Sequence, residues 1–136
     1  MFLLDTNVLS EIRKGARCHP SVHQWAREVL LVSIGYVSVI ALGEIRKGIE
    51  IIQRRDPESA SHLGRWLEEL KDEYSGRTLP VSLQVAEEWG RLNAVRPMPA
   101  ADSLMAATAN VHRLTLVTRN TGDLAATGAR LLNPFA

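Results

Sequence analysis

The chain has 136 residues, of which 46% are hydrophobic, and its formal net charge is +1 at pH 7. This length fits one domain that buries a core without staples, and the single cysteine, Cys18, excludes a disulfide framework. A charge so near to neutral does not by itself indicate a nucleic acid, a membrane or another partner.

The sequence carries no sign of a membrane span or of a secretory leader. No apolar stretch approaches the roughly 20 residues that cross a bilayer. The N-terminal apolar run is short and has no basic segment before it, unlike a signal peptide. We therefore expect a single domain over residues 1–136 that works in the cytoplasm.

Short apolar runs predict the strands of a sheet. In chain order they are residues 2–4, 35–38, 77–81, 114–118 and 131–132. Helical patterns separate these runs, and such alternation indicates a short parallel sheet covered by helices on both faces. The expected class is therefore α/β, with three layers.

Capping residues and apolar spacing predict the helices. A brief helix over residues 7–14 ends at Gly15, and Asp56 caps a helix that has Pro57 in its first turn. The expected apolar faces are Val22, Trp25 and Val29; Ile45, Ile49 and Ile52; Leu63, Trp66, Leu67, Leu70 and Tyr74; and Val85, Trp89 and Leu92. A helix rich in small residues is expected over 103–112, packed close to the sheet.

Four acidic residues stand at positions where chemistry is expected. Asp5 ends the first strand, Asp102 precedes the small-residue helix, and Asp123 follows a late strand, while Glu44 lies inside a helix. Each has an ordinary interpretation: a helix N-cap for Asp5 or Asp102, a Glu44–Lys47 surface pair, a turn residue for Asp123. Ligands of parallel α/β sheets bind beyond the carboxyl ends of the strands, so together the acids indicate one site.

The pentapeptide Glu-Ile-Arg-Lys-Gly occurs at residues 11–15 and again at 44–48. Two copies of five residues do not make a repeat architecture. They do give Glu11 and Glu44 the same local sequence, so only the fold can distinguish the two. We expect Glu44, which follows the second strand, to face Asp5.

Five segments together resemble the successive motifs of the PIN-domain ribonuclease toxins of the VapC type, in the plasmid-stability and FitB-like branch. These segments are LLDTNVLSEIRKG, SVIALGEIRKG, PAADSLMAATA, LVTRNTGDL and LLNPF, in this order along nearly the whole chain. Residues 53–95 match only in helical character. The resemblance implies a PIN-like α/β fold and a ribonuclease that depends on Mg²⁺ or Mn²⁺.

The resemblance also implies roles for particular residues and for partners. Asp5 and Asp102 would be the main metal ligands and Glu44 a further acid. The fourth acid is Asp123, or is replaced by Asn120; we favour Asp123. The protein would be the toxin of a type II toxin–antitoxin pair, with RNA as substrate, an antitoxin protein as partner, and a homodimer as its assembly.

Polar and basic side chains near the acids are candidates for contact with RNA. They are Thr6, Asn7, Thr118, Arg119, Asn120, Arg46 and Lys47, with Arg13 and Lys14 as further cations. The four histidines, at 19, 23, 62 and 112, do not show the ligand spacing of a zinc site.

Two other functions remain open. A receiver or haloacid-dehalogenase-like phosphotransfer domain also places an aspartate after its first strand beside Mg²⁺. The first would need a lysine after a late strand, and the second an aspartate where this chain has Asn7. A non-catalytic PIN-like binding domain is the second alternative, and the presence of all four acids is against it.

Overall fold

A computed structural model describes every residue from Met1 to Ala136 and contains one sheet of five parallel strands, in the order β3-β2-β1-β4-β5. The strands are β1 (Phe2–Leu4), β2 (Gly35–Ser38), β3 (Thr78–Leu79), β4 (Thr115–Val117) and β5 (Arg130–Leu132). All five lie where the sequence predicts them. The third is shorter than expected because Pro80 follows it, and proline has no N–H to donate to the next rung.

Seven α-helices connect these strands, together with three short turns of other helical types. The α-helices are α1 (Thr6–Ile12), α2 (Pro20–Trp25), α3 (Val39–Ile52), α4 (Pro57–Glu73), α5 (Leu83–Val95), α6 (Ala100–His112) and α7 (Thr121–Leu124). The 3₁₀ turns are η1 (Gly15–Arg17) and η3 (Ala125–Thr127), and η2 (Ala26–Leu30) is a π-helical turn that continues α2. The predicted cap at Asp56 is confirmed: its side chain accepts from the Ser59 N–H at 3.0 Å.

Three helix predictions need correction. The helix predicted over 7–14 ends at Ile12, and Gly15, at φ 61°, begins η1 instead of closing the helix. Trp89 is 36% exposed, so only Val85 and Leu92 of that predicted face are buried. The small-residue helix starts at Ala100 with Pro99 as its N-cap, because the two alanines before Asp102 are strong helix formers.

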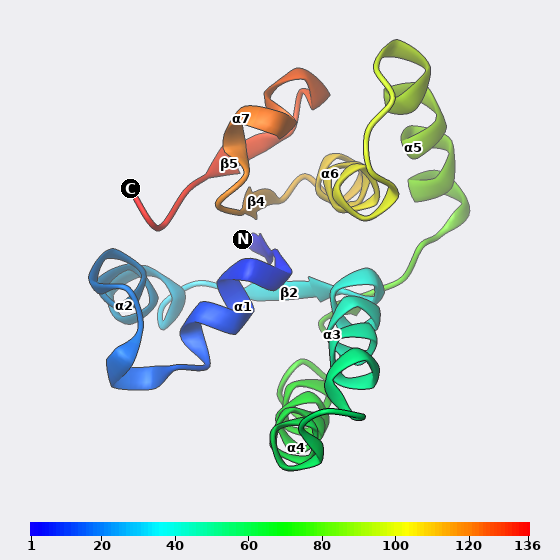
Figure 1. Ribbon diagram of the computed structural model, residues 1–136. Coiled ribbons are helices and arrows are strands. Elements are labelled where there is room, and N and C mark those ends of the chain that lie inside the picture. The colour runs from blue at the N-terminus through cyan, green and yellow to red at the C-terminus, as the bar shows by residue number, and fades with distance from the viewer.

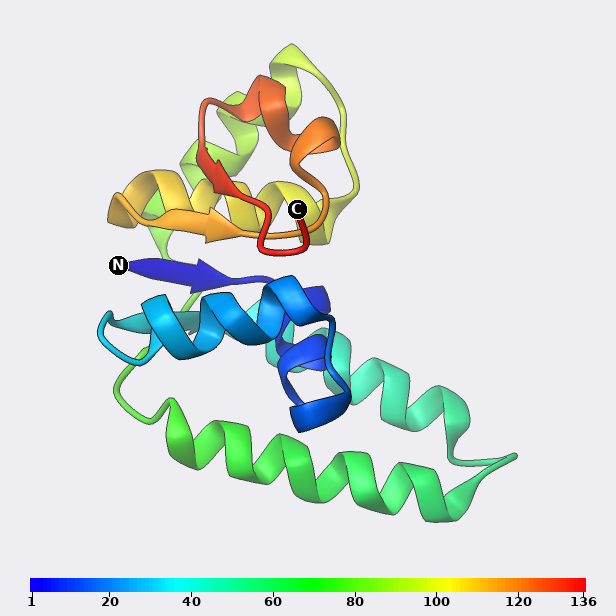
Figure 2. The same cartoon turned by 90° about the vertical axis from the view of Figure 1, so that its left-hand side faces the viewer.

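Helices cover both faces of the sheet, with α1 and α2 on one face and α5 and α6 on the other (Figures 1 and 2). Helices α3 and α4 form a hairpin that projects past the β2 side of the molecule (Figure 2). None of the helices combines the length and apolar character that a membrane crossing needs.

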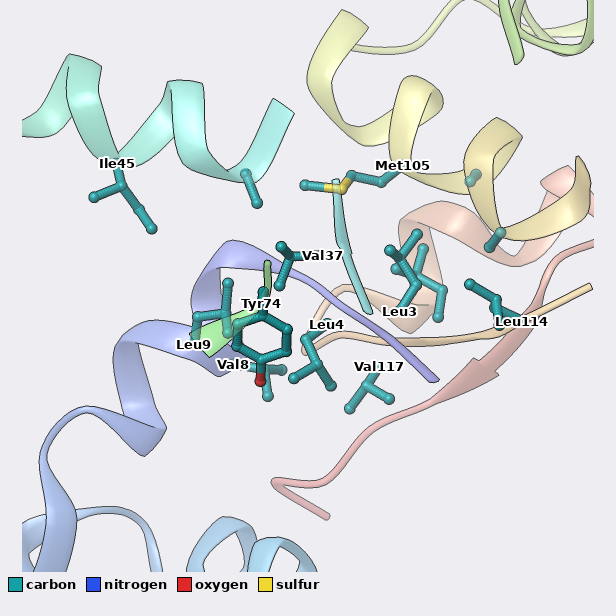
Figure 3. Close-up of a cluster of buried hydrophobic side chains, with 14 of the residues drawn as sticks. Leu3, Leu4, Val8, Leu9, Val37, Ile45, Tyr74, Met105, Leu114 and Val117 are labelled. Atoms are coloured by element: carbon teal, nitrogen blue, oxygen red, sulfur yellow. The ribbon is translucent and has the colours of Figure 1, made fainter. Parts of the chain in front are cut away.

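Side chains that alternate along the strands fill the core on both sides of the sheet. Leu3 and Leu4 are both fully buried, and consecutive strand residues point to opposite faces. Leu3 lies on the side of Met105, whereas Leu4 lies on the side of Val8 and Tyr74 (Figure 3). The first strand is therefore buried on both faces, and the residue that follows it has a fixed position.

The middle of helix α6 lies inside the protein, where Met105 to Ala109 are all buried. Its residues Ala106, Ala107 and Ala109 are at most 1% exposed, and α6 packs against α5 as well as against β4. The buried hydroxyl of Thr108 donates to the Leu104 carbonyl at 2.7 Å, so this polar group is satisfied within the helix. Small side chains allow close packing here, which fixes the start of α6 at the carboxyl edge of the sheet.

Candidate functional site

Asp5 is the most firmly held side chain at the carboxyl edge of the sheet. It is 6% exposed and stands at the N-cap of α1, where its Oδ1 accepts from the Thr6 N–H at 2.8 Å. Its Oδ2 accepts from the Thr118 hydroxyl at 2.7 Å and from the Asn7 amide at 3.2 Å. Capping and a role in the site are therefore compatible, because the cap fixes the carboxylate in place.

Thr118 comes from the end of β4 and is fully buried. Its hydroxyl donates to Asp5 and accepts from the Asn120 N–H at 3.1 Å, and its own N–H donates to the Leu132 carbonyl at 2.9 Å. The sequence suggested Thr118 as a substrate contact. Its burial and its bonds fit instead a role in holding Asp5.

Glu44 reaches the site from the second turn of α3. Its Oε1 accepts from the Thr6 hydroxyl at 2.7 Å, and Thr6 is the neighbour of Asp5. The alternative surface pair with Lys47 is not among the ion pairs of the structure, where Arg46 pairs weakly with Glu50 at 4.0 Å. Neither Arg46 nor Lys47 bonds to the acidic group.

Glu11, which has the same local sequence as Glu44, points elsewhere. It accepts from the His19 N–H at 2.9 Å and from the Lys14 ammonium at 3.1 Å. These bonds tie the end of α1 to the start of α2. The expected difference between Glu11 and Glu44 therefore arises from tertiary structure.

Asp102 lies inside the first turn of α6, not before it, so the interpretation of Asp102 as the N-cap is wrong. Burial, together with the negative charges of Asp5 and Asp123, raises the pKa of the Asp102 carboxyl. No hydrogen bond contributes to lowering that pKa. The charges of Asp5 and Asp123 thus reach Asp102, although the three residues come from distant parts of the chain.

Asp123 and Asn120 occupy the start of α7. Asp123 lies in its first turn and is one of the charges that act on Asp102. Asn120 is exposed at the N-cap position, and its side chain makes no capping bond. This arrangement supports Asp123 as the fourth acid and leaves the Asn120 amide free.

Arg119 is held beside the acids by two contacts that the sequence did not suggest. Its N–H donates to the Asn7 side-chain oxygen at 3.2 Å, and its guanidinium lies over the Phe135 ring at 4.4 Å. Phe135 in turn meets the His19 ring edge-on, with centroids 5.5 Å apart. The only sequence signal for Phe135 was the closing motif LLNPF, and no motif indicated a role for His19.

A divalent cation with oxygen ligands fits this donor set. In the conformation described, no three histidine, cysteine, aspartate or glutamate side chains already surround one point as ligands. Mg²⁺ keeps several waters and needs only a few carboxylates. Burial, and then the negative charges of Asp5 and Asp123, raise the pKa of Asp102, and a bound cation would offset the repulsion between these carboxylates.

Comparison with known proteins gives consistent matches over almost the whole length. The profile of the PIN domain family matches residues 2–129. The chain is 31% identical over 140 residues to Toxin FitB of Neisseria gonorrhoeae, with 99% of each chain covered. It is 29% identical over 140 residues to the VapC ribonuclease Y4jK of Sinorhizobium fredii, covering 99% of this chain and 98% of the relative.

The fold is similar to that of a solved relative. The crystal structure of FitAcB from Neisseria gonorrhoeae superposes with a TM-score of 0.86 at 31% identity, covering 99% of both chains. The expected α/β architecture with a parallel sheet is therefore confirmed.

The crowding at Asp102 gives a prediction about stability. A carboxyl whose pKa is raised by folding favours the folded state below the ordinary aspartate pKa of about 4, and this contribution is lost as pH rises through the folded pKa. Asp102→Asn should therefore melt at the same temperature as the wild type or higher at pH 7 in EDTA. This advantage should shrink towards pH 4.

Excess Mn²⁺ should reverse the order at pH 7, because the ion stabilises only the intact native site; at a hundred times the dissociation constant this amounts to about 2.7 kcal/mol. Differential scanning fluorimetry of both proteins measures these shifts. A variant that melts well below the wild type in EDTA, with equal shifts in Mn²⁺, would show Asp102 to be structural.

Proposed function

Because the chain belongs to the PIN domain family, we propose that it is a toxin of the VapC type, a metal-dependent endoribonuclease that hydrolyses RNA phosphodiester bonds. We take residues 1–136 to act as one PIN domain. The observation that carries the proposal is the meeting of acids at the carboxyl edge: the charges of Asp5 and Asp123 reach Asp102, and Glu44 is bonded to Thr6, the neighbour of Asp5.

The four acids would hold Mg²⁺ or Mn²⁺, with Asp5 and Asp102 as the principal ligands. Such an ion supplies an acidified water for attack and stabilises the charge that develops on the phosphate. The chain's own part is orientation. Thr118 and the Thr6 N–H fix the two oxygens of Asp5, and the Thr6 hydroxyl directs Glu44.

Asn7, Arg119 and Asn120 are the groups best placed for contact with RNA. The Asn7 amide donates to Asp5 while its oxygen accepts from the backbone N–H of Arg119, so Asn7 joins the acid to the main chain of the loop that carries Arg119. Arg119 is exposed and its guanidinium lies over the Phe135 ring, and such a group can bind a phosphate or stack on a base.

The alternatives explain less of this arrangement. A haloacid-dehalogenase-like domain would need an aspartate where this chain has Asn7, and a receiver domain would need a lysine after β4, where this chain has Arg119 and Asn120. A binding domain without catalysis would gain nothing from carboxylates held together against their repulsion.

The central prediction is metal-dependent cleavage. Purified protein, free of antitoxin, should cut single-stranded RNA with Mg²⁺ or Mn²⁺ and stop in EDTA. Asp5→Asn and Asp102→Asn should each lower kcat/KM at least about a hundredfold, since the ion contributes several kcal/mol to the transition state. Gel analysis of end-labelled RNA measures this, and full activity in either folded variant would refute the site.

Glu44 and Glu11 supply a matched pair of variants for the same assay. Glu44→Gln should lower kcat/KM about tenfold or more, because the variant loses a charge at the site. Glu11→Gln should leave kcat near the wild-type value and lower the melting temperature, since Glu11 binds the His19 N–H. Equal reductions of activity in the two variants would contradict the placement of Glu44.

A toxin needs a restraint in the cell that makes it, so we propose an antitoxin protein as partner. Part of it would cover the acidic site, where an arginine can pair with the carboxylates that otherwise bind metal. Co-expression with the product of the neighbouring reading frame should relieve growth arrest and yield a stable complex. Harmless expression of the chain alone, with no complex formed, would instead favour a housekeeping nuclease.

Phe135 gives a prediction about substrate binding. Phe135→Leu removes the ring under Arg119 and should raise KM for RNA about twofold to fivefold, as an exposed cation–π contact is worth about 0.5–1 kcal/mol. The value of kcat should stay the same. Phe135→Trp keeps a ring and should bind RNA like the wild type; identical KM values for the leucine and tryptophan variants would exclude the role.

A further inference from the structure

A second charged surface lies at the C-terminal end of α1, whereas the acids lie at its N-terminal end. The end of α1 and the turn η1 face α4 across a groove of about 490 Å³. Its walls carry four permanent cations, Arg13, Lys14, Arg17 and Arg65, and a single carboxylate, Glu69. We refer to it as the α1–α4 groove.

This concentration of charge contrasts with the chain as a whole, whose net charge is +1. Lys14 is paired with Glu11, and Arg13 lies over the Trp66 ring at 5.3 Å, so both are held in place. Arg17 and Arg65 take part in none of the ion pairs of the structure. Two fixed cations and two free ones thus line one groove.

The groove and the acidic site are joined by one short helix. Asp5 caps the start of α1 and Arg13 caps its end, which places them about 12 Å apart along the helix axis. Helix α4 also packs against α3, which carries Glu44. In Figure 2 the segment that follows α1 lies on the same side of the sheet as α4.

We propose that the α1–α4 groove binds the phosphate backbone of single-stranded RNA next to the cleavage position. The proposal rests on the ribonuclease function proposed above. A strand whose reacting phosphate lies at the acids carries further phosphates a few nucleotides away, and these need cations that do not compete for the metal. Arginine suits this role because its planar fork matches phosphate and is only weakly hydrated.

The contents of the groove favour RNA over a peptide. A peptide that covers both surfaces must bring positive charge to the acidic site and negative charge to the α1–α4 groove. RNA brings phosphate to the acidic site and to the groove alike. At the acidic site, a bound metal would allow phosphate to lie near the carboxylates. The Arg13–Trp66 stack adds an amphipathic wall of the kind that single-stranded nucleic acids use.

The test measures binding of a fluorescein-labelled single-stranded RNA of about 12 nucleotides by anisotropy. The full chain carries Asp102→Asn so that the RNA stays intact. Arg17→Gln combined with Arg65→Gln removes the two free cations of the groove. Arg54→Gln combined with Arg55→Gln, at the turn between α3 and α4, removes the same charge outside it.

The groove variant should bind at least tenfold more weakly at low salt. The slope of log Kd against log salt should fall by about 1.4, because each of the two phosphates that the variant no longer neutralises accounts for about 0.7. The control pair should change neither the affinity nor the slope. In proteins with Asp102 intact, the groove variant should raise KM for the long RNA and leave kcat, and cleavage of an RNA of about four nucleotides, unchanged.

Other outcomes separate the two proposals. If the groove variant and the control variant bind RNA equally well, the RNA-binding role of the groove is overturned, even if the wild type cuts RNA with metal. A groove variant that fails to bind antitoxin but still binds RNA also overturns it and assigns the groove to the protein partner. Groove-dependent RNA binding by a wild-type chain that cuts no RNA supports the groove and refutes the nuclease.

Discussion

The carboxylate of Asp5 is the constraint on which the site depends, because it is charged, nearly buried and cannot be left without partners. Its hydrogen bonds come from α1 and from the end of β4, more than a hundred residues later in the chain. One side chain therefore joins two adjacent strands and a helix at the same edge. Thr118, which completes this junction, is as buried as any core residue.

Parallel strands explain why the other acids arrive at this edge. In such a sheet every strand ends on the same side, so the helices that follow β1 and β2 begin there, as do α6 and α7. Asp102 and Asp123 lie in first turns, where the positive end of a helix favours a carboxylate. The helix ends therefore favour the charged form of these carboxylates, against the burial and the repulsion that raise the pKa of Asp102.

The sequence was informative where local patterns and chain order determine the outcome. The short apolar runs predicted all five strands, and the predicted strand ends correctly placed Asp5 and Thr118 at the carboxyl edge of the sheet. It could not decide which residue begins α6, because two alanines can extend a helix as readily as Asp102 can cap it. The stack of His19, Phe135 and Arg119 joins three distant segments, and no local pattern carries that information.

The tight burial of α6 has a consequence for how sequence variation affects this protein. The alanines at 106, 107 and 109 leave no space for a larger side chain, so a bulky residue there would move the helix as a body. Because Asp102 is carried on the same helix, such a shift would displace a carboxylate that the substituted residue never touches. Substitutions in the apolar interior can thus abolish activity while the protein stays folded. Neutral substitutions at these positions are limited to the smallest residues.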